Sequence, residues 1–247
     1  MRQKIDFGID LGTTNSAIAY MQEGEAIIVK SDANQMDTTA SCVTFNQRKN
    51  IWVGLNAKQK IEEDAERSFK NRKQNVANGY QEFKRTMGTD YSYSSSYMER
   101  SYTSEELSAE VLKKLKSYVL NEDVVSAVIT VPAMFKQPQL DATQRAAELA
   151  GFKYCELLQE PIAASIAYGI KANSATGYWL VFDFGGGTFD AALMHVEDGI
   201  MKVVDTEGDN HLGGKDLDNA IVDKILIPEL EKQCSLDETL VRHRVLL

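Results

Sequence analysis

Cysteine and histidine are scarce in this chain of 247 residues, which contains three of each. The cysteines, Cys42, Cys155 and Cys234, are far apart and form no C-x-x-C pair. Neither the cysteines nor the histidines have the spacing of metal ligands. The sequence therefore predicts three free, mostly buried thiols in a reducing compartment, without a disulfide framework.

Long apolar runs and an excess of basic charge are also missing. No segment has the apolar length of a membrane span, and the apolar pattern begins at Ile5, too early to leave room for a signal or transit peptide. The 27 basic and 36 acidic residues give a net charge of −9. Such a surface repels nucleic-acid phosphates and anionic membranes. We therefore expect a cytoplasmic protein that binds neither nucleic acid nor membrane, although local glycine-rich backbone and a metal ion can still bind a nucleotide.

Apolar residues make up 43% of the chain, enough to bury a core in one large domain or two lobes. Strands are predicted at residues 5–9, 17–21, 26–30, 125–131, 178–184, 188–196 and 200–205. Helices are predicted at residues 55–75, after the capping box at Thr103, from Pro138 to Gly151, from Glu160 to about Gly169, and from Gly213 onward, where Pro228 should bend or end the helix. Residues 89–101 should form a loop or weak hairpin. Strands followed by helix occur early and again late, which suggests an internal structural repeat.

A first segment of chemical interest combines an apolar strand, an aspartate, a glycine turn and hydroxyl side chains. It spans residues 8–16 and contains Asp10, Gly12, Thr13, Thr14 and Asn15. Backbone N–H groups in such a turn can bind phosphate oxygens, and the hydroxyls can join them. The aspartate can hold a magnesium ion through water. Taken alone, the segment fits an ordinary polar hairpin turn equally well.

A second segment, residues 180–190, repeats the same order. Asp183 is followed by Gly185, Gly186, Gly187 and Thr188. Three consecutive glycines permit backbone conformations and close approaches that side chains forbid. Two such turns can face each other and grip a triphosphate from both sides. Other phosphate motifs do not fit, because residues 208–215 are out of register for a P-loop and no strand is followed by G-x-G-x-x-G.

With other short motifs, these turns make the chain resemble the nucleotide-binding domain of the DnaK-type heat-shock chaperones, within the actin and sugar-kinase superfamily. The matching runs occur in the family's order and are residues 8–16, 83–85, 130–133, 160–164, 182–190 and 208–214. The resemblance implies an α/β fold of the actin-like or ribonuclease-H-like type. Lobe I would be residues 1–172, with a remodelled inserted subdomain at about 38–102, and residues 173–247 would be a partial lobe II. The family's peptide-binding domain is not expected in this chain.

The resemblance also implies roles for individual residues. Asp10 and Asp183 would hold the water shell of Mg²⁺ on the phosphates, and Asp190 would accept from the attacking water or coordinate K⁺. Lys84 would contact the γ-phosphate and, with Glu160, the hydrolytic water, which makes Lys84, Glu160, Asp183 and Asp190 the catalytic set. Nucleotide contacts would come from Asp10, Gly12, Thr13, Thr14, Asn15, Gly185, Gly186, Gly187, Thr188, Gly213 and Gly214. From the residues alone, Lys84 could instead be a solvated surface lysine and Glu160 a helix cap.

The implied function is binding of ATP and its hydrolysis to ADP and phosphate in a chaperone cycle. The implied partners are a J-domain co-chaperone, a nucleotide-exchange factor and unfolded peptides. Two alternatives stay open, a non-catalytic interaction module on the same fold and a small-molecule kinase of the same superfamily. A kinase would need an aspartate poised for a substrate hydroxyl, where this chain has Pro132 and Ala133. Leu140 replaces an arginine that usually contacts the substrate domain, which predicts weak stimulation by peptide.

Overall fold

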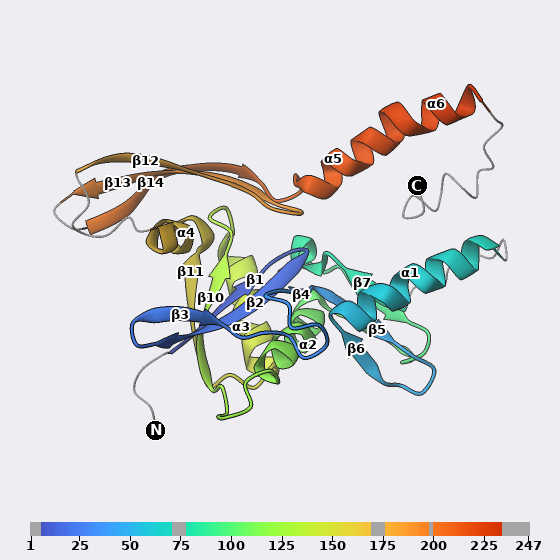
Figure 1. Ribbon diagram of the computed structural model, residues 1–247, viewed down its shortest axis with the longest axis horizontal. Coiled ribbons are helices and arrows are strands. Elements are labelled where there is room, and N and C mark those ends of the chain that lie inside the picture. The colour runs from blue at the N-terminus through green and yellow to red at the C-terminus, as the bar shows by residue number, and fades with distance from the viewer. Residues whose placement is uncertain (1–5, 71–77, 169–175, 198–199, 234–247) are drawn as a thin grey trace.

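The computed structural model describes residues 6–70, 78–168, 176–197 and 200–233 (Figure 1). Its largest sheet has six strands in the order β11–β10–β1–β2–β3, with β4 paired to β2. These strands are β1 (Phe7–Leu11), β2 (Asn15–Gln22), β3 (Glu25–Ile28), β4 (Thr39–Ala40), β10 (Ser126–Val131) and β11 (Tyr154–Gln159). Within it, β1 runs parallel to β10 and antiparallel to β2.

Alternation along β1 determines which side chains reach the functional face of this sheet. Phe7, Ile9 and Leu11 are buried in the main core, whereas Gly8 and Asp10 lie on the opposite face. The predicted strand at residues 5–9 is therefore shifted toward the C-terminus by two residues, with Ile5 outside the described residues. Because β1 extends to Leu11, Asp10 belongs to the strand itself and is held by its ladder.

Helices α2 (Ser104–Lys116) and α3 (Gln137–Leu149) pack on each other and bury the core face of the large sheet. The predicted capping box at Thr103 is confirmed. Thr103 Oγ1 accepts from the backbone N–H of Glu106 at 3.3 Å, and the Glu106 carboxylate accepts from the Thr103 N–H at 2.9 Å. Pro138 lies in the first turn of α3 as predicted. Gly151, just beyond α3, has a φ of 84°, which suits glycine at a helix end.

The segment after β4 forms a smaller layer beside the large sheet. Its three-stranded sheet has the order β6–β5–β7, with β5 (Cys42–Phe45), β6 (Ile51–Val53) and β7 (Gly79–Gln81), covered by α1 (Leu55–Lys70). The 3₁₀ helix η1 (Phe83–Thr86) follows, and then the hairpin β8 (Tyr93–Ser95) and β9 (Arg100–Tyr102). The weak hairpin predicted for residues 89–101 is thus present. The predicted last turn of the first helix, residues 71–75, lies outside the described residues.

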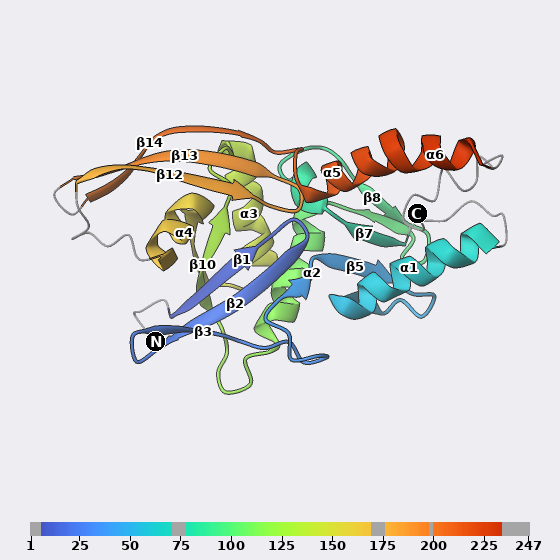
Figure 2. The ribbon, with the colours of Figure 1, turned by 45° about the horizontal axis from the view of Figure 1, so that its top comes forward.

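A second sheet consists of β12 (Gly177–Phe184), β13 (Phe189–Glu197) and β14 (Ile200–Asp209), all antiparallel. This meander repeats the pairing of β1, β2 and β3, in agreement with the internal repeat suggested by the sequence. Helix α4 (Glu160–Tyr168) packs against β10 and β11 of the first sheet and against β12 and β13 of the second. Figure 2 shows β12 to β14 crossing above the strands that contain Asp10 and Thr130.

The described chain ends in a long helical segment. It consists of α5 (Gly214–Ile221), a π-helical turn (Val222–Leu226) and α6 (Ile227–Glu231). Pro228, which was predicted to bend or end the helix, falls in the first turn of α6 directly after the π turn, and the helical segment continues to Glu231, so Pro228 does not end it. Figures 1 and 2 both place α5 and α6 on the same side of the molecule as α1. Among the described residues, none of the helices combines the length and the apolarity that a membrane crossing requires.

Candidate functional site

A cavity of about 550 Å³ lies where the two predicted glycine turns meet, a size typical of small-molecule sites. The β1–β2 turn contributes Asp10, Gly12, Thr13, Thr14 and Asn15 to its wall. The β12–β13 turn contributes Asp183, Gly185, Gly186 and Thr188. The two strand-aspartate-glycine-threonine segments, about 170 residues apart in sequence, therefore face one space.

The two turns approach so closely that side chains at the glycines have no room. A Cβ atom on Gly186 would collide with the side chain of Thr14, and one on Gly187 would collide with Thr13 and Arg85. A Cβ atom on Gly213 would likewise collide with the backbone of Gly186 and Gly187. The glycines therefore serve a close backbone approach between the two halves of the site.

Thr13 has a polar atom that the protein itself does not satisfy. Its Oγ1 is buried at the cavity wall, without a hydrogen-bond partner among the described residues. A buried hydroxyl of this kind is costly unless something bonds to it. An oxyanion in the cavity, such as a phosphate oxygen, is a suitable partner, because Thr13 Oγ1 can donate to it.

The carboxylates of Asp10 and Asp183 both line the cavity and give this part of its wall a negative charge. Thr130 Oγ1 donates to Asp10 Oδ1 at 2.9 Å and so fixes that carboxylate. Burial raises the pKa of Asp183, and the negative charge of Asp10 raises it further. A cation between the two carboxylates would relieve this repulsion. In the sequence Thr130 belongs only to the short motif at residues 130–133, and its place beside Asp10 depends on the pairing of β1 with β10.

Lys84 and Glu160 form a buried ion pair on the same wall. Lys84 Nζ lies 2.7 Å from Glu160 Oε1, and the lysine side chain is only 5% exposed. The surface-lysine alternative for Lys84 is therefore wrong, because η1 directs the side chain inward. Burial raises the pKa of Glu160, against the opposing effect of Lys84, and the charges of Asp10 and Asp183 raise it too. Glu160 also begins α4, so the capping alternative is compatible with this position.

The remaining predicted residues lie behind the cavity wall. Asp190 is 2% exposed, faces Asp183 across the β12–β13 ladder, and accepts from the Met134 N–H at 3.3 Å through Oδ1. Gly214 donates its N–H to the Gly185 carbonyl at 3.0 Å. Gly213 and Gly214 therefore brace the second turn, and Gly187 is buried within it. The predicted contacts of all three glycines with a nucleotide stay predictions.

A family model described as Hsp70 protein matches residues 6–244. The chain belongs to the Hsp70 family. It is 41% identical over 233 residues to the chaperone protein DnaK of Thermosipho africanus, an alignment that covers 93% of this chain and 37% of that relative. It is 38% identical to the chaperone protein DnaK of Thermotoga neapolitana, over 96% of this chain and 38% of the relative. The chain thus spans a little over a third of the length of the curated relatives that it matches.

Membership of the Hsp70 family agrees with the α/β fold and with the expected actin-like arrangement of two sheets. It favours an Hsp70-type domain over the small-molecule kinase that the sequence left open. Leu140, the departure noted in the sequence, packs against the apolar cluster of Met87, Val131, Phe135 and Ala142. An arginine in the same place would need its charged group to leave this cluster.

The donor set of the cavity fits a nucleotide phosphate with its magnesium ion. Cationic Lys84, the free hydroxyl of Thr13 and the backbone of the glycine turns suit the phosphate oxygens. Across the described ranges, no three His, Cys, Asp or Glu side chains gather closely enough to hold a metal ion. The two carboxylates of Asp10 and Asp183 suit Mg²⁺, which usually keeps several waters and binds through one or two carboxylates and the substrate phosphates.

Proposed function

We propose that the chain binds Mg²⁺–ATP in this cavity and hydrolyses it to ADP and phosphate as the nucleotide step of a chaperone cycle. The observation that carries the proposal is the buried Lys84–Glu160 pair on the wall that also holds both aspartate-glycine turns. Lys84, which is 5% exposed, lines the same cavity as the unpaired hydroxyl of Thr13, and a phosphate oxygen there could accept hydrogen bonds from both. Membership of the Hsp70 family supports the same function.

Binding would divide between the two turns. Thr13 and Thr14, with the backbone of Gly12 and Asn15, would hold the phosphates from the first turn. Gly185, Gly186 and Thr188 would hold them from the second. Asp10 and Asp183 would orient water molecules around Mg²⁺. That ion would neutralise the charge that the phosphates bring to an acidic site.

Catalysis would depend on positioning and on charge. Lys84 Nζ would stabilise the charge that develops on the γ-phosphate oxygens. Glu160 would accept a proton from the attacking water, and its raised pKa makes it a stronger base than an ordinary carboxylate. Asp190 lies behind the wall, and its contact with the water or with K⁺ stays a prediction.

The proposal extends to the organisation of the chain. Residues 1–172 would form lobe I, with the inserted subdomain at about 38–102, and residues 173–247 would belong to lobe II. A J-domain co-chaperone, a nucleotide-exchange factor and unfolded peptides are the proposed partners, and the cytoplasm is the proposed location. Family membership supports these statements in general terms.

Titration of ATP into the chain by calorimetry, with and without Mg²⁺, tests the proposal. We expect Mg²⁺-dependent binding that weakens about tenfold or more in Asp10→Asn, a loss of about 1.4 kcal/mol. The matched control is Asp90→Asn, which removes a carboxylate from an exposed loop outside the cavity. Binding that needs no Mg²⁺, or that is equal in Asp10→Asn and the wild type, would contradict the proposed site.

A further inference from the structure

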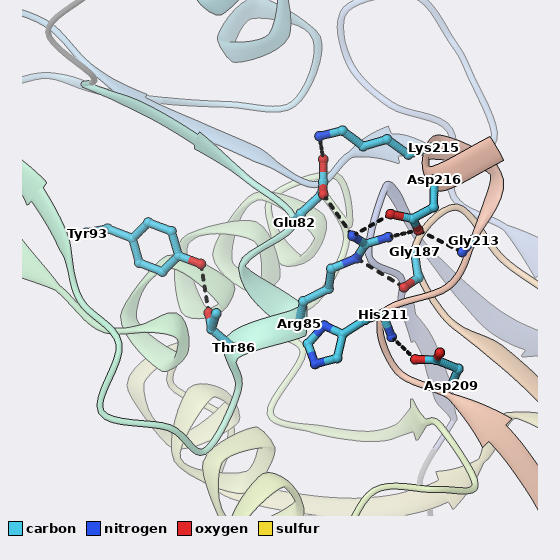
Figure 3. Close-up of polar contacts among 10 residues, drawn as sticks. All are labelled: Glu82, Arg85, Thr86, Tyr93, Gly187, Asp209, His211, Gly213, Lys215 and Asp216. Atoms are coloured by element: carbon cyan, nitrogen blue, oxygen red, sulfur yellow. Dashed lines mark hydrogen bonds and ion pairs between the residues drawn. The ribbon is translucent and has the colours of Figure 1, made fainter. Parts of the chain in front are cut away.

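A group of residues, most of them charged, connects η1 with the second glycine turn and with the start of α5 beside the cavity (Figure 3). We call it the Arg85 cluster, and it consists of Glu82, Arg85, Gly187, Lys215 and Asp216. The Arg85 guanidinium donates to both carboxylate oxygens of Asp216, with Nη1 at 3.2 Å from Oδ1 and Nη2 at 2.5 Å from Oδ2. Its Nε donates to the carbonyl oxygen of Gly187 at 3.0 Å. One side chain from η1 therefore binds both the second glycine turn and the start of α5.

Neighbouring residues complete the cluster. Glu82 forms ion pairs with Lys215 and, at 3.6 Å, with Arg85 Nη1. Asp216 Oδ2 also accepts from the backbone N–H of Gly213 at 2.8 Å, which closes the turn that braces Gly185 to Gly187. The Arg85 hydrogen bonds hold the pKa of Asp216 below its usual range, so this carboxylate stays charged at neutral pH.

This contact differs from an ordinary surface ion pair, which contributes little to stability. The Arg85 side chain is 16% exposed and that of Asp216 is 30% exposed. The bidentate geometry fixes the guanidinium plane, and the bond to a backbone carbonyl adds a third fixed direction. Such an arrangement specifies a position, whereas a flexible surface pair supplies only charge.

The cluster also lies next to the proposed chemistry on both sides. Arg85 follows Lys84 in η1, and Gly187 lies between Gly186 and Thr188, which line the cavity. Gly187 already packs against Thr13, so a small opening of the cluster separates the two turns. The Arg85 cluster is therefore placed to affect both the spacing of the two turns and the position of Lys84.

We propose that Arg85 is a positioning residue which, through Asp216 and Gly187, holds the second glycine turn against the first and so controls how long the nucleotide stays bound. The proposal rests on the proposed function for the identity of the ligand. The existence of the closed contact can be tested without any nucleotide.

The test compares four variants of the whole chain, namely Arg85→Ala, Arg85→Lys, Asp216→Ala and the double alanine variant. Stopped-flow fluorescence measures the dissociation of a fluorescent ADP in the presence of Mg²⁺. We expect release to be about tenfold faster in Arg85→Ala, equivalent to about 1.4 kcal/mol. The effects of the two single alanine variants should be less than additive in the double variant, because both remove the Arg85–Asp216 contact, while Asp216→Ala also removes the bond to the Gly213 N–H. Arg85→Lys should resemble Arg85→Ala, since lysine keeps the charge and loses the fork.

Arg145→Ala is the matched control, because Arg145 forms a similar ion pair with Glu105, at 2.9 Å, between α3 and α2. Its release rate should equal that of the wild type. Amide hydrogen exchange on the nucleotide-free chain provides the second readout. In Arg85→Ala, exchange should rise in residues 185–188 and 213–216, with no change in α2, which would also show that the variant is folded.

Each outcome decides one question. Release from Arg85→Ala at the wild-type rate, full retention by Arg85→Lys, or strictly additive single variants would overturn the positioning role. A wild-type chain that binds no ADP would contradict the proposed function instead. In that case the exchange data alone decide the contact: a local rise in Arg85→Ala supports it, and unchanged exchange overturns it.

Discussion

Lys84 and Glu160 form an ion pair that is almost removed from solvent, at 5% and 14% exposure. Replacing Lys84 by methionine keeps much of the side-chain volume and leaves Glu160 without its cation. We expect this variant to lose about 3 kcal/mol of unfolding free energy and to hydrolyse ATP very slowly in single-turnover assays. ATP binding should be largely retained, because both glycine turns remain. Denaturant unfolding and a calorimetric titration measure the two quantities.

The double variant Lys84→Met/Glu160→Gln separates stability from chemistry. Removing both charges should recover most of the stability, because no uncompensated buried charge remains. Hydrolysis should stay lost, since neither the cation nor the proton acceptor is present. Normal single-turnover hydrolysis in either variant would mean that Lys84 has a structural role only.

Three carboxyl groups near the cavity, Glu160, Asp183 and Asp190, have pKa values raised by burial. The folded state therefore keeps protons at pH values where the unfolded state, with ordinary pKa values of about 4, has lost them. The stability that they contribute is fully present below the unfolded pKa and is lost as pH rises through the folded pKa. Without Mg²⁺, Asp183→Asn should therefore raise the melting temperature at pH 7.5.

This gain in Asp183→Asn should shrink when the melting temperature is measured at pH 4.5, because the raised pKa brings the wild-type carboxyl nearer to its protonated form there. Asp90→Asn, in an exposed loop, should leave the melting temperature unchanged at both values. A gain that is equal at the two pH values would show that the asparagine acts by packing and that the raised pKa of Asp183 is not the cause.

The residues that the sequence could identify are those whose neighbours in the chain supply the signal. Asp10 and Asp183 are each followed by a glycine turn, so their place at a cavity was predictable. Thr130 and Arg85 act across large separations. Thr130 bonds to Asp10, 120 residues away, and Arg85 bonds to Asp216, 131 residues away. No local pattern contains these pairings, because they exist only after the strands and lobes have assembled.

At the scale of single elements, the N-terminus of α2 offers a clear test. Thr103 and Glu106 satisfy each other's backbone N–H groups, and the helix buries Leu107, Val111 and Leu112 in the main core. Thr103→Ala should cost about 1 kcal/mol of unfolding free energy. Thr103→Ser keeps the hydroxyl and should cost much less. Equal losses in the two variants, measured by denaturant unfolding, would assign the effect to the methyl group.

Element boundaries show where sequence patterns lose their power. The long strands β12 and β13 and the helices α2 and α3 were predicted because their periods continue over many residues. Strands β4 to β7 have two to four residues each, too few to establish alternation. Strand β11 was missed because its burial does not alternate between fully buried and exposed positions. The π turn before Pro228 was not predicted, because it has no sequence signature.

At the scale of the whole molecule, the second sheet presents an apolar outer face. Tyr178, Leu180 and Phe182 are 67%, 70% and 67% exposed among the described residues, and Phe184 continues the row. Contiguous apolar surface of this kind promotes association. The chain of 247 residues should therefore self-associate with rising concentration, as measured by size-exclusion chromatography with light scattering.

Leu180→Lys should reduce this association, because it places a charge in the middle of the row. Leu120→Lys is the matched control, since Leu120 is 89% exposed and lies outside the second sheet, in the segment between α2 and β10. A wild-type chain that remains monomeric at all concentrations would contradict the prediction. Association that Leu120→Lys reduces as strongly would place the contact elsewhere.

The repeated meanders give the cavity two similar walls, but the ionisable pair that would perform hydrolysis comes from neither, because Lys84 lies in η1 and Glu160 begins α4. The second sheet contributes Asp183, the second glycine turn and the Gly187 carbonyl, which accepts a hydrogen bond from Arg85. The near-symmetric frame thus holds an asymmetric reaction centre. Sequence drift in the second sheet and α5 should alter nucleotide residence time first, whereas drift around η1 and α4 should alter turnover. Nucleotide residence time and turnover should therefore be able to evolve separately.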